Sequence, residues 1–176
     1  MAKKYNFTQE RSDYLTPPEA IQEIFQELNL LGIFTGEKFD CDVCCSQKNI
    51  PAWNHFIDGQ NDGLSLEWHN LNYCNPPYKT CDKWVKKAFA EFKNGKTSVL
   101  LIPARTETKY WQDCILKEGY ALRDNIHVRF LRKGLCFLNP DTKEQMGVFK
   151  NALAVVIFDG RKNKSIKSLE TKIEVK

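Results

Sequence analysis

The chain has 176 residues, 42% of them hydrophobic and 27% charged, and a formal net charge of +4 at pH 7. This length suits one domain with one core, and the composition is that of an ordinary globular protein. No apolar run approaches the ~20 residues that span a bilayer, and no apolar stretch follows the basic N-terminus as in a secretory signal. We therefore expect a cytoplasmic protein with no membrane partner, whose mild positive charge permits nucleic-acid binding without implying it.

The cysteines argue against a secreted, disulfide-stabilised domain. There are 7, an odd number, scattered from position 41 to position 136. A disulfide framework would favour an even number in a shorter chain, so we expect reduced and mostly buried thiols. Cys41 and Cys44 form a C-x-x-C pair, but no second pair at zinc spacing follows. We expect no metal site, and zinc at this pair is the minor alternative.

The first predicted element is a helix over residues 16–31. Thr16 suits the N-cap, Pro17 suits the first helical position, and Glu19 completes a capping box with Thr16. Apolar residues then recur at helical spacing, and Gly32 follows as a stop signal.

The rest of the chain alternates strand and helix patterns. We predict strands at 38–44, 71–74, 97–102 and 153–158, helices at 80–93 and 106–117, and a long ordered loop over 46–70. Two further strand candidates, 126–131 and 135–138, could pair around Lys133-Gly134. This order predicts an α/β fold with a mostly parallel sheet and an antiparallel C-terminal strand pair. One domain over 1–160 precedes a basic tail, 161–176, which forms a last strand or stays flexible.

The strongest chemical signal is the string Asn75-Pro76-Pro77-Tyr78, which follows a predicted strand. In an α/β fold, ligands bind at the carboxyl ends of the strands, where Asp42 also lies. The Asn75 side-chain oxygen and a Pro-Pro carbonyl can both accept hydrogen bonds from an exocyclic amine of a base. The two prolines fix φ and keep these acceptors rigid, and Tyr78 can stack on a flipped-out base. A proline-stiffened turn is the structural alternative.

These residues resemble the phage-type DNA N6-adenine methyltransferases, within the wider amino-methyltransferase superfamily. The resemblance implies a single-domain, Rossmann-like enzyme that transfers a methyl group from S-adenosylmethionine to adenine N6 in DNA. A phage-encoded enzyme would work in the host cytoplasm. The matching segments are Tyr14-Leu15-Thr16-Pro17, Phe39-Asp40-Cys41-Asp42-Val43, Asp62-Gly63-Leu64 with Trp68, Asn75-Pro76-Pro77-Tyr78, Trp84, and Leu101-Ile102-Pro103-Ala104-Arg105-Thr106 with Trp111.

The resemblance also implies cofactor-binding residues. Thr16 and Pro17 match the element that contacts the methionine moiety. Asp40 and Asp42 match the acidic end of the first cofactor motif, which suits the methionine ammonium or ribose hydroxyls, and Asp62 is a candidate for ribose or adenine. The chain departs from the family in two segments, since no glycine-rich loop follows Asp42 and no Gly-Arg precedes the late Phe. These segments read Val43-Cys44-Cys45-Ser46 and Arg132-Lys133-Gly134-Leu135-Cys136-Phe137.

The candidate DNA contacts are basic residues, although solvated faces explain such runs more often than phosphate contacts do. Arg105 follows a buried strand and could touch DNA or close over the site. The others are Lys79, Lys83, Arg129, Arg132 and Lys133.

Two alternatives remain at this point. The same chemistry could act on RNA adenine or on cytosine N4. A catalytically silent DNA-binding or assembly subunit could also keep this fold. The intact Asn75-Pro76-Pro77-Tyr78 string argues against silence, and the missing glycine-rich loop argues for it.

Overall fold

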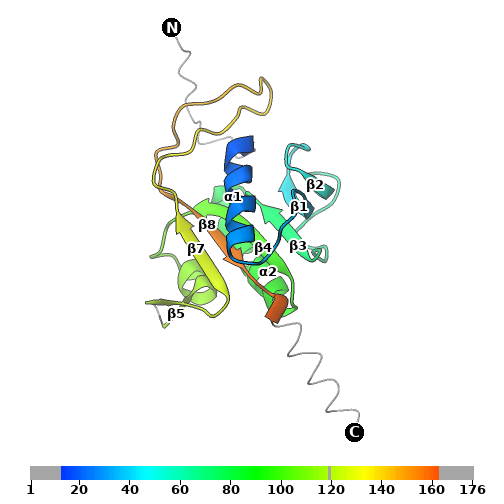
Figure 1. Cartoon of the computed structure of the whole chain (residues 1–176). Helices are drawn as coiled ribbons and strands as arrows, with labels where there is room; N and C mark the ends of the chain where they lie inside the picture. The colour runs from blue at the N-terminus through cyan, green and yellow to red at the C-terminus, as the bar shows by residue number, and fades with distance from the viewer. Residues whose placement is uncertain (1–12, 119, 163–176) are drawn as a thin grey trace.

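The structure is a computed structural model that describes residues 13–118 and 120–162. A six-stranded sheet with the order β2-β1-β3-β4-β8-β7 forms its centre (Figure 1), and β5 and β6 form a small antiparallel pair. The strands are β1 (Phe39–Cys45), β2 (Ala52–Ile57), β3 (Leu71–Cys74), β4 (Thr97–Pro103), β5 (Leu116–Lys117), β6 (Ala121–Leu122), β7 (Ile126–Phe130) and β8 (Leu153–Phe158).

Strand direction confirms the predicted mixed α/β class. β2, β1, β3 and β4 are parallel, whereas β8 runs antiparallel between β4 and β7. Every residue of β4 and of β8 is buried, as expected for central strands, and both sequences are mostly apolar. The antiparallel pairing was predicted, but its partners are β7 and β8.

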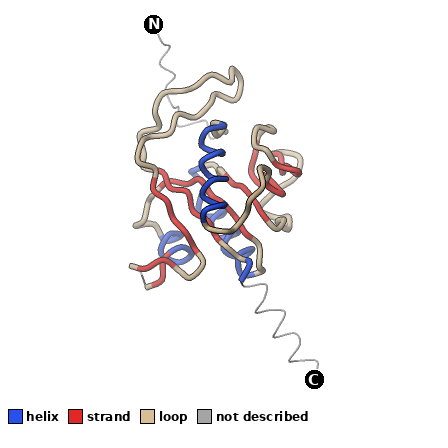
Figure 2. Tube along the Cα trace, viewed as in Figure 1, coloured by secondary structure: helices blue, strands red, loops and turns tan. Residues whose placement is uncertain are grey.

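Helices cover both faces of the sheet (Figure 2). Helix α1 (Pro18–Leu30) buries Ile21, Ile24 and Leu28 against one face, which includes Val99 and Leu101 of β4. Helix α2 (Cys81–Lys93), which follows the short helix η1 (Tyr78–Thr80), packs on the other face together with η2 (Trp111–Ile115). Alternate residues of β4 therefore enter opposite apolar clusters, because successive side chains of a strand point to opposite faces.

The predicted capping box is wrong. Helix α1 begins at Pro18 with Pro17 as its N-cap residue, and no side chain caps it. The hydroxyl of Thr16 lies instead 2.8 Å from the hydroxyl of Tyr73. A tertiary hydrogen bond has thus replaced the local one that the sequence predicted.

Two further predictions need correction. The segment 46–70 contains β2, an edge strand whose Trp53 and Asn54 face solvent, so it lacks the apolar run of a buried strand. The segment 106–117 is helical only from 109 to 115, partly as a π-helix, and Leu116–Lys117 pair with β6 instead.

Residues 131–152, between β7 and β8, form a long projecting loop whose two arms run alongside each other (Figure 1), and we call this segment the ribbon. The amide of Phe149 donates to the Leu135 carbonyl at 2.9 Å, and the amide of Met146 donates to the Phe137 carbonyl at 2.8 Å. The predicted pairing of 135–138 with 126–131 is therefore wrong, because β7 already pairs with β8. The ribbon also exchanges two backbone hydrogen bonds between Leu138 and Leu15, ahead of α1.

No helix within 13–118 or 120–162 has the length and apolar character to cross a membrane. Most of the predicted basic tail, residues 163–176, lies outside the described part of the chain.

Candidate active site

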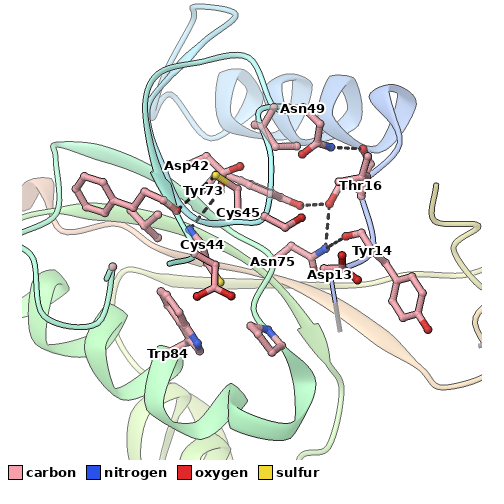
Figure 3. Close-up of a pocket in the computed structure, with 18 of the residues that line it drawn as sticks. Asp13, Tyr14, Thr16, Asp42, Cys44, Cys45, Asn49, Tyr73, Asn75 and Trp84 are labelled. Carbon is pink, nitrogen blue, oxygen red and sulfur yellow. Dashed lines mark hydrogen bonds between the residues drawn. The ribbon is translucent and has the colours of Figure 1, made fainter. Parts of the chain in front are cut away.

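A cavity of about 280 Å³ opens at the carboxyl ends of β1 and β3 (Figure 3). This volume is near the lower end for small-molecule sites, and the location is the usual one for ligands of an α/β sheet. Its walls come from residues 13–16 ahead of α1, from the end of β1, from the loop after β2, and from Asn75, Pro77, Thr80 and Trp84 after β3.

Asn75 is fixed by hydrogen bonds to the segment ahead of α1. Its Nδ2 donates to the Tyr14 carbonyl oxygen and to Thr16 Oγ1, both at 3.2 Å. A carbonyl oxygen can only accept, so the amide nitrogen must face Tyr14 and the amide oxygen must point away from it. Within the described ranges no group donates to Asn75 Oδ1. This oxygen is a preoriented hydrogen-bond acceptor at the cavity wall.

Thr16 and Tyr73 hold this arrangement in place. The Thr16 hydroxyl lies between Asn75 Nδ2 and the buried Tyr73 hydroxyl, and Asn49 Nδ2 donates to the Thr16 carbonyl at 3.2 Å. Burial raises the pKa of Tyr73 well above its ordinary value, so its hydroxyl stays protonated. Tyr73 was absent from the sequence-based candidates because a strand tyrosine looks like a core residue.

Asp42 is a buried carboxyl group that lines the cavity and is only 1% exposed. Burial raises its pKa to about 7, and a long hydrogen bond from the Cys44 amide, 3.4 Å, offsets this only in part. No lysine or arginine of the described residues forms an ion pair with it. A buried carboxylate is costly without a partner, so this wall of the cavity suits a cationic ligand group.

Residues 44–46, which follow Asp42 where no glycine-rich loop is present, line the cavity. The pairing of β1 with β2 shifts register between Asp42 and Cys45, so this irregularity of the strand lies at the cavity wall. All seven cysteines are free thiols, and burial raises the pKa of Cys41 to about 12. The described residues contain no cluster of three or more His, Cys, Asp or Glu that could hold a metal ion.

Gly63 allows the loop after β2 to lie directly on β1. A Cβ at this position would overlap the carbonyl oxygen of Val43 and crowd the ring of Trp84. Trp68 Nε1 donates to the Gly63 carbonyl at 2.7 Å, and Asp62 Oδ1 accepts from the Leu64 amide at 2.9 Å. Gly63 was not among the predicted site residues, although an Asp-Gly pair is a turn signal that could have indicated this role.

We expect Gly63→Ala to destabilise the fold by about 1–3 kcal/mol, as overpacking does, and to deform the cavity wall. Thermal unfolding measures the change in stability, and calorimetric titration with S-adenosylmethionine, the cofactor expected from the sequence, measures the change in the cavity. Gly59→Ala is the matched control, since Gly59 has a positive φ of 77° but open space around it. It should cost stability while leaving ligand affinity intact. Wild-type affinity in Gly63→Ala would contradict the assignment.

The other predicted site residues do not all reach the cavity. Asp40 Oδ2 accepts from the Leu71 amide at 2.9 Å, which ties β1 to β3 away from the cavity lining. The Tyr78 ring packs edge-on against Phe149 of the ribbon, with centroids 5.5 Å apart, and lies outside the lining. Its hydroxyl is buried with no hydrogen-bond partner among the described residues, and burial raises its pKa. Pro76 is buried, whereas Pro77 and Asp62 line the cavity.

The predicted DNA contacts differ in exposure and in whether a carboxylate already lies beside them. Arg129 binds the carboxylates of Glu27 and Glu23 on α1, at 2.7 and 3.4 Å, so its charge is neutralised within the fold. Arg105 is exposed and lies 3.3 Å from Glu107. The remaining ones are exposed on η1, in the first turn of α2 or at the base of the ribbon, and they are Lys79, Lys83, Arg132 and Lys133.

Comparison with protein-family models gives a match. The model of a family described as DNA N-6-adenine-methyltransferase (Dam) covers residues 6–175, which is nearly the whole chain. No significant match is found among curated proteins or among solved structures.

Proposed function

The chain belongs to the DNA N-6-adenine-methyltransferase (Dam) family, and we propose that it moves a methyl group from S-adenosylmethionine to N6 of an adenine flipped out of duplex DNA. Membership implies DNA adenine methylation. The observation that carries the finer proposal is that Asn75 Oδ1, to which no group of the described residues donates, and the buried carboxyl of Asp42 line one cavity at the carboxyl edge of a mostly parallel sheet. We take this sheet to be a Rossmann-like methyltransferase domain.

The residues present fit the cofactor. Bound S-adenosylmethionine supplies a methyl group on a positively charged sulfur, together with an ammonium group and ribose hydroxyls. Asp42 would bind the ammonium, because a buried, unpaired carboxylate favours a cationic partner. Asp62, exposed at the cavity rim, is the candidate for a ribose hydroxyl. We assign Asp40 to the β1–β3 connection instead of to the cofactor.

Thr16 would act mainly by orienting Asn75, and Pro17 by setting the start of helix α1. Thr16 Oγ1 accepts from Asn75 Nδ2 and contacts the Tyr73 hydroxyl, so its side chain is already engaged. Pro17 turns the chain into α1. The segment would thus shape the cavity around the methionine end of the cofactor while it orients the catalytic amide.

Asn75 would act directly on the reacting nitrogen. Its Oδ1 would accept one N6–H of adenine, and a carbonyl of the Pro-Pro pair would accept the other. The Pro77 carbonyl already accepts from the Thr80 amide and hydroxyl, at 3.0 and 3.3 Å, so Pro76 is the candidate for that carbonyl. Two fixed acceptors would draw the amine towards tetrahedral geometry and free its lone pair for in-line attack.

Tyr78 would meet the face of the flipped base. Because its ring lies outside the lining of the cofactor cavity, on the side of Phe149, we propose that the base enters between Asn75 and the ribbon. A tyrosine ring offers a stacking surface to any base.

Methyl transfer with labelled cofactor to duplex DNA, RNA or protein tests the function. We expect labelled N6-methyladenine from DNA digests. Labelled N4-methylcytosine, or transfer to RNA alone, would replace adenine in DNA as the substrate. Cofactor binding without any transfer would favour a silent subunit. Because its substrate is DNA, we propose the cytoplasm as its place of action, the host's if the gene is a phage's.

DNA affinity should fall steeply with salt concentration, because phosphate contacts release counterions. Lys79→Ala and Lys83→Ala should each reduce the slope of log affinity against log salt by about 1. Fluorescence anisotropy at several salt concentrations measures this slope. Lys38→Ala is the charge-matched control, because Lys38 lies over Trp53 beside the edge strand β2. An unchanged slope in both test variants would remove these lysines from the DNA interface.

A further inference from the structure

Phe130 is an exposed aromatic residue that the proposed reaction leaves without a role. Its side chain, at the end of β7, is 55% exposed. The ring stacks on the buried ring of Trp111, with centroids 6.3 Å apart and planes 11° from parallel. Trp111 is itself fixed by a hydrogen bond of 3.1 Å from Nε1 to the Pro103 carbonyl. A rigid tryptophan thus supports one face of Phe130.

The sheet register brings Phe130 to the level of the catalytic motif. Phe130 is paired with Ala154, and Ala154 with Ile102 of β4. Cys74, immediately before Asn75, is paired with Leu100, only two residues earlier on the same strand. β7 lies three strand spacings from β3, or roughly 14 Å. That distance is close to the ~12 Å width of a DNA major groove.

Three chain segments that carry exposed basic residues converge at the end of β7, where Phe130 lies. The Leu131 amide donates to the Leu153 carbonyl, and the Ala104 amide donates to the Ala152 carbonyl, both at 2.9 Å. These bonds join the end of β7, the end of β4 and the last residues of the ribbon. The exposed cations next to these junctions are Arg105, Arg132, Lys133 and Lys150. A phosphate backbone would be held beside the aromatic ring.

We propose that Phe130 stacks, through the ring face that Trp111 leaves exposed, on the DNA base pair next to the target adenine, in place of the adenine that has flipped out. This inference rests on the proposed function. Flipping a base costs unstacking energy, and an aromatic ring that replaces the lost stacking offsets part of that cost. The basic residues in the segments next to Phe130 would supply the sequence-independent phosphate contacts, and Trp111, on which the ring stacks, fixes the orientation of the ring.

The test compares Phe130→Ala, Phe130→Trp and wild type on two duplexes. Sequencing of a plasmid methylated by the wild-type chain first locates a modified adenine. One duplex then carries this adenine paired with thymine, and the other carries it opposite an abasic site, where flipping costs less. Leu30→Ala is the control, because Leu30 is an exposed apolar residue of α1. Cofactor affinity and the melting temperature check that each variant keeps its fold.

Loss of one base stack should lower kcat/KM of Phe130→Ala about 5- to 150-fold on the paired duplex. The loss should shrink to less than about threefold opposite the abasic site, and Phe130→Trp should stay near wild type on both. An equal loss on both duplexes, or no loss on either, would overturn the proposal. Absence of methyladenine with the wild-type chain would instead overturn the proposed function.

Discussion

Asn75→Ala is expected to lower turnover on DNA by about 10²-fold or more while cofactor affinity is retained. The variant loses a preoriented polar group at the reacting nitrogen, and such groups contribute on this scale. The Asn75 amide nitrogen is already bound to the Tyr14 carbonyl and Thr16, so only the oxygen is available for the base. Single-turnover methylation and calorimetry with the cofactor measure the two quantities separately.

The conservative change Asn75→Asp separates positioning from acceptor strength. A carboxylate keeps an acceptor but cannot donate to the Tyr14 carbonyl, so it should turn away from that oxygen and lose part of the activity. Asn54→Ala is the control, since Asn54 lies on the exposed edge strand β2 and its Nδ2 donates to the Asp40 carbonyl of β1. Full turnover in Asn75→Ala would sink the proposed mechanism.

Asp42→Asn is expected to weaken cofactor binding by about 1–3 kcal/mol, the scale of a lost charge-assisted hydrogen bond. The same change should stabilise the ligand-free protein near neutral pH. The Asp42 pKa is raised from its ordinary value of 3.8 to about 7, so the fold favours the protonated carboxyl. That contribution to stability is complete below pH 3.8 and is lost as the pH rises through about 7. Asparagine resembles the protonated form at every pH.

The pH dependence of cofactor affinity is opposite in sign to the pH dependence of stability. The ammonium group needs the ionised carboxylate, so affinity should fall as the pH drops below about 7, and Asp42→Asn should flatten this dependence. Calorimetry from pH 5.5 to 8.5 and thermal unfolding without ligand make the comparison. Asp58→Asn is a suitable control, because Asp58 lines the same cavity but is exposed. An unchanged affinity in Asp42→Asn would mean that another group binds the ammonium.

Much of the fold could be predicted because its central strands carry their own signal. Residues 97–102 and 153–158 are mostly apolar and are bounded by turn residues, the short segment 71–74 stands directly before the Asn75-Pro76 turn, and each of the three is a strand of the sheet. β2 could not be found in this way, since an edge strand with exposed Trp53 and Asn54 lacks such a run. Local patterns also misled at Thr16, where a hydroxyl suited to an N-cap contacts a distant tyrosine.

Some residues of the candidate site could likewise be identified from the sequence, and others could not. Asp42 and Asn75 were singled out because polar residues stand out at strand ends, and both line the cavity. Gly63 and the Tyr14 carbonyl were not, because their parts depend on backbone groups from other segments. Arg129 looks like a phosphate ligand in the sequence, and only the three-dimensional structure shows Glu27 and Glu23 beside it.

The backbone pairing of Leu15 with Leu138 has a consequence for how the chain folds. The segment that orients Asn75 belongs to the start of the chain, yet its partner comes near the end, and the tip of the ribbon also binds Gln47 through the Pro140 carbonyl. Closing so long a loop is slow and entropically costly, so this part of the cavity should form late. A ligand that binds only the completed cavity then stabilises the whole fold by mass action. Bound cofactor would thus indicate that the chain has completed its folding as well as that it is ready for catalysis.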